Sequence, residues 1–245
     1  RSAKIIHIDI DPAEIGKNIE TDIPLVGSAK LILNELCEKS DKLCAENWSA
    51  DLQGKRPFNG DSWNGVIRPK RVIQSLCQAA DDDAVLVADV GQNQIWSARG
   101  FSIPHGRFLT SGGMGTMGYS IPAAVGAKLA APNRQVIAVC GDGSFQMQMM
   151  ELATIRGNDI PVKIMVMNNG RLGMVRELQD KKYGGNKTAV FLDGNPDFVK
   201  LAESYAIRSR RITRDENIDE AVREMLASPE PYLLECAVSP EEATL

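Results

Sequence analysis

The sequence predicts an α/β protein with a doubly wound, mostly parallel sheet and helices on both faces. Short, continuous apolar runs such as 135–140 and 162–167 are typical of strands that are buried on both sides of a parallel sheet. Segments with apolar residues at helical spacing alternate with these runs, and they are separated by glycine, proline and asparagine. An alternating order of strands and helices favours parallel β-α-β units.

The expected elements follow one another along most of the chain. A strand at 4–10 precedes Asp11-Pro12, a pair typical of a helix start with proline in the first turn. Residues 42–53 have a helical pattern, and 54–65 are rich in glycine, proline and asparagine, so a domain boundary is expected there. The remaining expected helices lie at 69–80, from 92 onward, near 122–127, and at 144–155, 196–205 and 218–227, and the remaining strands at 84–89, 135–140, 162–167, 207–211 and 232–237.

Polar residues follow two consecutive predicted strands, as Gly141-Asp142-Gly143 and Asn168-Asn169. A right-handed crossover places the carboxyl ends of both strands at one edge of the sheet, where open α/β sheets bind ligands. We therefore expect Asp142 and Asn169 to meet there. Mg²⁺ prefers about six oxygen ligands, so a carboxylate, an amide oxygen and a carbonyl would leave room for phosphate oxygens.

Ser144 is a candidate N-cap for the helix after the first of these turns. The N-terminus of such a helix favours phosphate charge through its unpaired N–H groups and its dipole. The alternative interpretation is that Asp-Gly and Asn-Asn-Gly are ordinary turn sequences.

The segment Gly113 to Gly118 fits the pattern G-x-G-x-x-G, which raises the alternative of a dinucleotide site. That interpretation needs an acidic residue about 20 positions later to bind a ribose. No aspartate or glutamate occurs between Asp89 and Asp142. The context therefore does not favour a dinucleotide site.

Composition excludes several classes of function. With a formal net charge of −4 and no basic cluster, the chain gives no reason to expect nucleic acid. No apolar run is long enough to predict a membrane span. The five cysteines form no C-x-x-C pair, which favours reduced thiols in the cytoplasm. Only two histidines are present, so a His-rich zinc site or a Ser-His-Asp triad is not expected.

Gly141-Asp142-Gly143-Ser144-Phe145, together with Asn168-Asn169, resembles the signature of thiamine-diphosphate-dependent enzymes. Three further segments are similar, in the same order, to landmarks of the acetolactate synthase (acetohydroxyacid synthase) large subunit. They are Gly91-Gln92-Asn93-Gln94, the segment 111–118 and the segment 168–176. The resemblance extends over roughly 67–238 and implies a thiamine-diphosphate-binding fold.

The resemblance implies a set of site residues. The Mg²⁺ ligands would be Asp142, Asn169 and the carbonyl of Arg171. The cofactor-binding residues would be Gln92, Asn93, Gly115, Met117, Gly141, Gly143, Ser144 and Met174. Met117 would lie beneath the cofactor and impose its V shape, and no other catalytic role is expected on this chain. Many relatives carry histidine where Asn93 stands. Acetolactate synthases commonly carry tryptophan where Leu178 stands, and its ring lines the substrate channel and stacks against sulfonylurea-type inhibitors.

The same resemblance implies the organisation of the whole enzyme. Residues 1–37 would be the last strand and helix of a central domain, 38–66 a linker, and 67–245 the thiamine diphosphate and Mg²⁺-binding domain. The intact transferase would decarboxylate pyruvate and join the two-carbon unit to a second 2-keto acid in branched-chain amino acid biosynthesis. It would form a homodimer or a higher homo-oligomer, with a small regulatory subunit as a further partner.

Two parts of the intact enzyme are not expected within this sequence. The FAD site of the central domain would be largely absent, and so would the pyrimidine-binding domain, which supplies a glutamate from another subunit. The 245-residue chain alone is therefore expected to be inactive. The alternative functions are another thiamine-diphosphate enzyme, such as pyruvate oxidase or glyoxylate carboligase, and a stand-alone cofactor-binding module.

Overall fold

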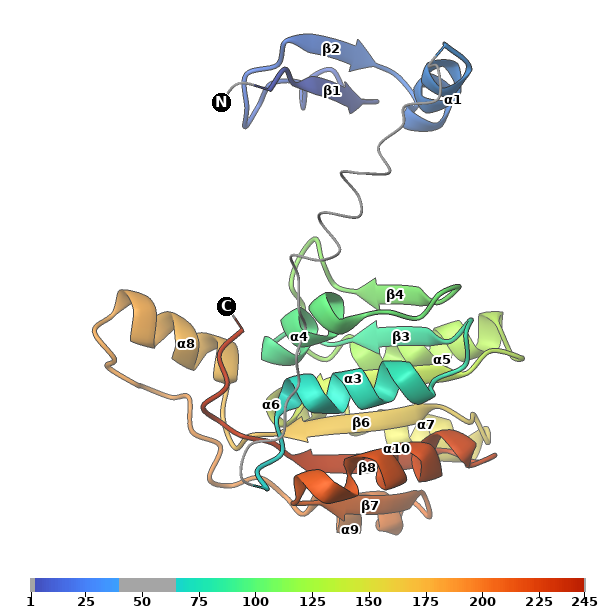
Figure 1. Cartoon of the computed structure of the whole chain (residues 1–245), viewed down its shortest axis with the longest axis vertical. Coiled ribbons are helices and arrows are strands. Elements are labelled where there is room, and N and C mark those ends of the chain that lie inside the picture. Colours follow the sequence, from blue (N-terminus) through green and yellow to red (C-terminus); the bar gives the residue numbers. More distant parts are fainter. Residues whose placement is uncertain (1–2, 40–64, 245) are drawn as a thin grey trace. The chain divides into compact units, whose positions relative to one another are not determined.

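The computed structural model describes residues 3–39 and 65–244. The chain divides into two compact units, Arg1–Pro57 and Phe58–Leu245 (Figure 1). The helical segment predicted at 42–53 lies outside the described residues. No helix in the two described stretches is long and apolar enough to cross a membrane.

The first unit contains β1 (Ile6–Asp9), β2 (Ile23–Val26) and α1 (Ala29–Lys39), and its two strands pair in parallel. The helix predicted after Asp11-Pro12 is wrong, because the chain makes turns there. Asp9 Oδ1 accepts a hydrogen bond from the Asp11 amide at 2.8 Å, and Asp11 Oδ1 accepts one from the Ala13 amide at 2.9 Å. Such local bonds from aspartate compete with helix formation. Strand β2 was not predicted.

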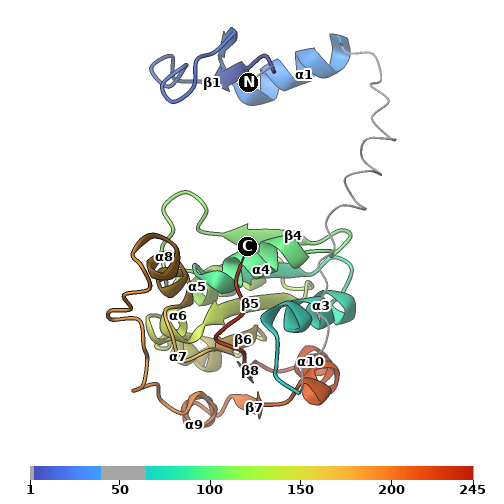
Figure 2. The same cartoon turned by 60° about the vertical axis from the view of Figure 1, so that its left-hand side comes forward.

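The second unit is a sheet with helices on both faces, as predicted (Figures 1 and 2). Its strands are β3 (Val85–Ala88), β4 (Arg107–Thr110), β5 (Val136–Gly141), β6 (Lys163–Asn168), β7 (Arg208–Ile212) and β8 (Tyr232–Ala237). Its helices are α3 (Pro69–Ala79), α4 (Gln92–Gly100), α5 (Ser120–Ala130), α6 (Asp142–Gln146), α7 (Glu151–Gly157), α8 (Gly173–Lys182), α9 (Phe198–Ser204) and α10 (Ile218–Ala227), with a 3₁₀ turn η1 at Asp215–Asn217. The strand order is β4-β3-β5-β6-β8-β7, and every pairing is parallel.

Alternating side chains of the central strands form two separate hydrophobic cores. Ile137 and Val139 belong to the core under α3 and α10, whereas Ala138 and Cys140 belong to the core under α5 and α9. Figure 2 shows these two groups of helices on opposite sides of the sheet. Because successive side chains of a strand point to opposite faces, a continuous apolar run serves both cores. This arrangement explains why the runs at 135–140 and 162–167 predicted strands correctly.

The helix predicted at 144–155 and the edge strand β4 differ from the sequence-based expectation. The single helix predicted at 144–155 is two helices, and the first begins at Asp142 with Gly141 as its N-cap instead of Ser144. The break at 147–150 lets the Gln148 side chain turn inward, where it is 2 % exposed and hydrogen-bonded. The edge strand β4 was not predicted, because it is only four residues long and not fully buried.

The sheet topology places three loops at one edge. From β3 the chain passes to β4 on one side, and β5 then pairs with β3 on the other side. The order therefore reverses between β3 and β5, and ligands of open α/β sheets bind at the carboxyl edge beside such a reversal. The loops that follow β3, β5 and β6 begin at this edge, where Figure 1 also shows α8.

Candidate functional site

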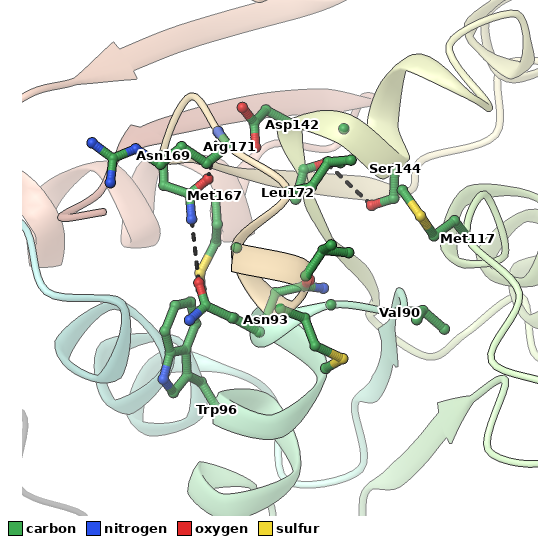
Figure 3. Close-up of a pocket in the computed structure, with 17 residues that line it drawn as sticks. Val90, Asn93, Trp96, Met117, Asp142, Ser144, Met167, Asn169, Arg171 and Leu172 are labelled. Carbon is green, nitrogen blue, oxygen red and sulfur yellow. Dashed lines mark hydrogen bonds between the residues drawn. The ribbon is translucent and has the colours of Figure 1, made fainter. Parts of the chain in front are cut away.

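A cavity lies at the carboxyl edge of the sheet, between the loops that follow β3, β5 and β6 (Figure 3). Ten of the eleven residues predicted for the site line it: Gln92, Asn93, Met117, Gly141, Asp142, Gly143, Ser144, Asn169, Arg171 and Met174. Gly115 is not among the lining residues of this cavity. The parallel crossover thus brings Asp142 and Asn169 to one site, as the sequence predicted.

Asp142 is a buried carboxylate at the start of α6, with 1 % of its surface exposed. Its Oδ2 atom accepts a hydrogen bond from Asn195 Nδ2 at 2.7 Å. Burial raises the pKa of Asp142, and hydrogen bonds from Asn195 and from backbone amides, including that of Gly170, oppose the shift. No lysine or arginine within the described ranges forms an ion pair with it. A bound cation would therefore stabilise this carboxylate in its charged form.

Asn169 lies in the turn after β6, and both ends of its amide have partners. Its Oδ1 atom accepts a hydrogen bond from the Arg171 amide at 3.0 Å, which closes an Asx turn. Its Nδ2 atom donates to Gln92 Oε1 at 3.4 Å, a contact drawn in Figure 3. Gln92 in turn donates from Nε2 to Glu177 Oε2 at 2.9 Å. The Glu177 carboxylate accepts hydrogen bonds and cannot donate one, so the NH₂ group of Gln92 faces Glu177. Gln92 Oε1 therefore faces Asn169 and accepts the hydrogen bond from its Nδ2 atom.

Three of the residues predicted for the site donate hydrogen bonds from their side chains to other groups of the protein. Asn93 donates from Nδ2 to the carbonyls of Asp89 and Val139, at 2.9 and 3.2 Å, so its side-chain donors are used within the protein. Ser144 Oγ donates to the Gly141 carbonyl at 3.2 Å. The Arg171 guanidinium donates to Glu241 at 3.0 Å, outside the cavity.

Met117 and Met174 supply apolar surface to the cavity from two different segments. Met117 lies in the loop between β4 and α5, and Figure 3 shows it on the same side of the cavity as Ser144. Methionine suits such a position, since its side chain is flexible, polarizable and makes few polar demands. Gly115 lies in the same loop with a φ of +70°, and the structure does not bring it to the cavity.

Sequence reasoning missed several residues of the site. Seven further residues line the cavity: Val90, Gly91, Trp96, Met167, Leu172, Gly173 and Val175. Asn195, which holds Asp142, also donates to Asn168 Oδ1 at 3.4 Å and accepts from Gln146 at 2.7 Å. It lies in the segment before α9, far along the chain from Asp142, and no local pattern marks it. Trp96 could have been found, because it follows Gln92 by one helical turn.

The donor set fits a magnesium-held diphosphate. Among the described residues no group of three His, Cys, Asp or Glu side chains could hold a metal ion. The cavity instead brings one carboxylate, Asp142, to the amide oxygen of Asn169 and to the backbone of Arg171. Mg²⁺ is commonly bound in this way, through one or two carboxylates together with waters and substrate phosphates. The apolar lining beside these donors suits the ring portion of a cofactor.

Comparison with known families defines the class of the protein. Residues 89–236 match the C-terminal TPP-binding domain of thiamine pyrophosphate enzymes, and residues 1–36 match the central domain of the same enzymes. The first match covers more than half of the chain. The chain therefore belongs to the thiamine pyrophosphate (thiamine diphosphate) enzyme family.

Individual relatives of this chain are named as acetolactate synthase large subunits. The chain is 43% identical over 263 residues to a probable acetolactate synthase large subunit of Methanococcus aeolicus, with 99% of this chain and 44% of the relative covered. A protein of the same name from Methanocaldococcus jannaschii is 44% identical over 257 residues, with 98% and 43% covered. The acetolactate synthase large subunit of Lactococcus lactis is 38% identical over 250 residues, with 100% and 43% covered. The chain thus spans less than half the length of these curated relatives.

Proposed function

We propose that this chain is the cofactor-binding portion of an acetolactate synthase large subunit. The intact enzyme would decarboxylate pyruvate and transfer the two-carbon unit to a second 2-keto acid. The names of relatives that are 38–44% identical over nearly the whole chain support this activity over pyruvate oxidase or glyoxylate carboligase. The observation that carries the proposal is the gathering of Asp142, Asn169 and Met117 around one cavity at the carboxyl edge of the sheet.

In this proposal Asp142, the Asn169 side-chain oxygen and the Arg171 carbonyl hold Mg²⁺, and the metal holds the diphosphate. Gly141, Gly143 and Ser144 lie beside the diphosphate, and Met117 and Met174 contact the rings. Thiamine diphosphate itself supplies the nucleophilic carbon and the electron sink for decarboxylation and carboligation. The chain's own residues orient this group and exclude water through the apolar lining.

The remaining features of the intact enzyme are part of the same proposal. Residues 1–37, 38–66 and 67–245 would be part of the central domain, a linker and the C-terminal domain, which the two family matches support. FAD would be bound by the intact central domain, and the subunit would associate as a homodimer or larger oligomer with a small regulatory subunit. A reducing compartment such as the cytoplasm is supported by the buried cysteines Cys77, Cys140 and Cys236, which are free thiols.

Calorimetric titration of the chain with thiamine diphosphate tests the cofactor site. We expect binding that requires Mg²⁺ and is lost when EDTA is added. In Asp142→Ala we expect the affinity to fall by about a hundredfold or more, because two charge-assisted contacts of roughly 1.5 to 3 kcal/mol each are removed. The matched control is Asp83→Ala. Asp83 lies just before β3, and its half-exposed carboxylate pairs with Arg134. Equal affinity in wild type and Asp142→Ala would refute the proposed metal site.

A further inference from the structure

The carboxylate of Asp89 is completely buried and accepts hydrogen bonds from the loop that carries Met117. Asp89 follows β3 directly, and each of its two oxygens accepts two hydrogen bonds. Oδ1 accepts from the amides of Val90 at 2.9 Å and Gly118 at 3.0 Å. Oδ2 accepts from the Ser120 amide at 2.7 Å and from Gln148 Nε2 at 2.9 Å. These bonds are of the strong, charge-assisted kind.

Gln148 forms further hydrogen bonds with the same segment. Its Oε1 atom accepts a hydrogen bond from the Ile121 amide at 2.7 Å, and its Nε2 atom also donates to Ser120 Oγ at 3.1 Å. Together, Asp89 and Gln148 satisfy the amides of Gly118, Ser120 and Ile121 at the start of α5. A helix N-terminus leaves these amides without partners inside the helix, so side chains from elsewhere in the fold can hold it in place.

The held segment begins immediately after Met117. Gly118 has a φ of +85°, and a Cβ atom there would lie 3.3 Å from Met147 Cβ, so the backbone passes close to the turn after α6. Gln148 belongs to that same turn. The backbone that follows Met117 is therefore held by contacts with the end of β3 and with the segment after the Asp142 turn.

We propose that Asp89, together with Gln148, is a positioning residue. It holds Met117 in a defined position relative to the turn 141–143, beside which the diphosphate would lie. This inference rests on the proposed function, since it concerns how the chain orients the rings of thiamine diphosphate. Asp89 and Gln148 do not line the cavity, and apart from the bond between Asp89 Oδ1 and the neighbouring Val90 amide their side chains act through the Met117 loop. They should therefore affect binding of the rings and leave binding of the diphosphate unchanged.

The test compares two ligands in the 245-residue chain, thiamine diphosphate and inorganic diphosphate, each with Mg²⁺. Asp89→Asn keeps the size of the side chain but places an NH₂ group against two of the four N–H donors. We expect its affinity for thiamine diphosphate to fall by about tenfold, equivalent to one lost charge-assisted hydrogen bond, and its affinity for inorganic diphosphate to change less than about twofold. Gln148→Met should produce a smaller effect in the same direction.

Asp219→Asn provides the matched control, because Asp219 accepts hydrogen bonds from Arg71 and Ser75 in the same unit but away from the cavity. It should change neither affinity. Far-UV circular dichroism checks that each variant is folded, and Gln148→Met carries the test if Asp89→Asn is not. Loss of both affinities together, or of neither, would overturn the positioning role. A wild-type chain that binds inorganic diphosphate with Mg²⁺ but binds thiamine diphosphate no more tightly would also overturn it, whereas a wild-type chain that binds neither ligand would refute the proposed function.

Discussion

Replacing Gly173 with alanine provides a sharp test of how the site is packed. Gly173 begins α8 and lines the cavity between Gln92 and Asn169. A Cβ atom at this position would lie 2.0 Å from Gln92 Oε1, 2.7 Å from Gln92 Cδ and 2.9 Å from Asn169 Nδ2. Carbon atoms do not approach oxygen this closely without a bond, so Gln92 must move.

The cost follows from the partners that Gln92 would lose. Gln92 is 4 % exposed and donates to Glu177 at 2.9 Å, so moving it away from Gly173 breaks this hydrogen bond. Losing a hydrogen bond to a charged group costs roughly 1.5 to 3 kcal/mol. Alanine gains at most about 1 kcal/mol over glycine in a helix interior, and less at the first helical residue. We therefore expect Gly173→Ala to lower the free energy of unfolding by about 1 to 2 kcal/mol.

The matched control is Gly126→Ala in α5, where nothing lies within 4 Å of the added Cβ. This exposed helical position should gain about 0.5 to 1 kcal/mol of stability. Urea denaturation of both variants should therefore give midpoint shifts of opposite sign. Calorimetry should show weaker binding of Mg²⁺ and thiamine diphosphate in Gly173→Ala only, because displacement of Gln92 frees the Asn169 amide. A Gly173→Ala variant as stable as wild type, with unchanged affinity, would refute this reasoning.

Two further predictions concern α8. Burial alone would raise the pKa of Glu177, but hydrogen bonds from Lys181, Gln92 and Thr244 outweigh it and lower the pKa to about 2. The stability that Glu177 contributes is therefore present above its ordinary pKa of 4.5 and is lost as the pH falls toward 2, so the difference in urea midpoint between wild type and Glu177→Gln should shrink between pH 5 and about pH 2.5. A difference that stayed constant over this range would contradict the assignment. Leu178 is 45 % exposed and lines a shallow hollow on α8 with Tyr183. By the resemblance to acetolactate synthases, Leu178→Trp in the intact enzyme should bind sulfonylurea-type inhibitors several-fold more tightly, since an aromatic contact adds about 0.5 to 1.5 kcal/mol. Inhibition that did not tighten would count against the placement of Leu178 in the inhibitor contact.

Local patterns predicted the central elements because their residues have the same role throughout their length. The strand at 232–237 and the helix at 218–227 were predicted with the bounds that the structure has for β8 and α10. The first is a continuous apolar run apart from Glu235, and the second has a buried stripe formed by Ile218, Ala221, Val222 and Met225. Short or half-exposed elements such as β2 and β4 carry no such pattern, and sequence reasoning missed them.

The class of fold, the convergence of Asp142 with Asn169, and the resemblance on which the cofactor assignment rests could all be predicted from the sequence. These follow from burial periodicity and from the handedness of the parallel crossover, which act over one β-α-β unit. Three features became visible only in the folded structure: Asn195 donates a hydrogen bond to Asp142, Glu177 orients Gln92, and Gly115 is not among the residues that line the cavity. The same is true of the break in the helix predicted at 144–155, where Gln148 turns inward toward Asp89. These contacts join residues far apart in the chain, and a buried polar group takes whatever partner the packed fold brings within hydrogen-bonding distance.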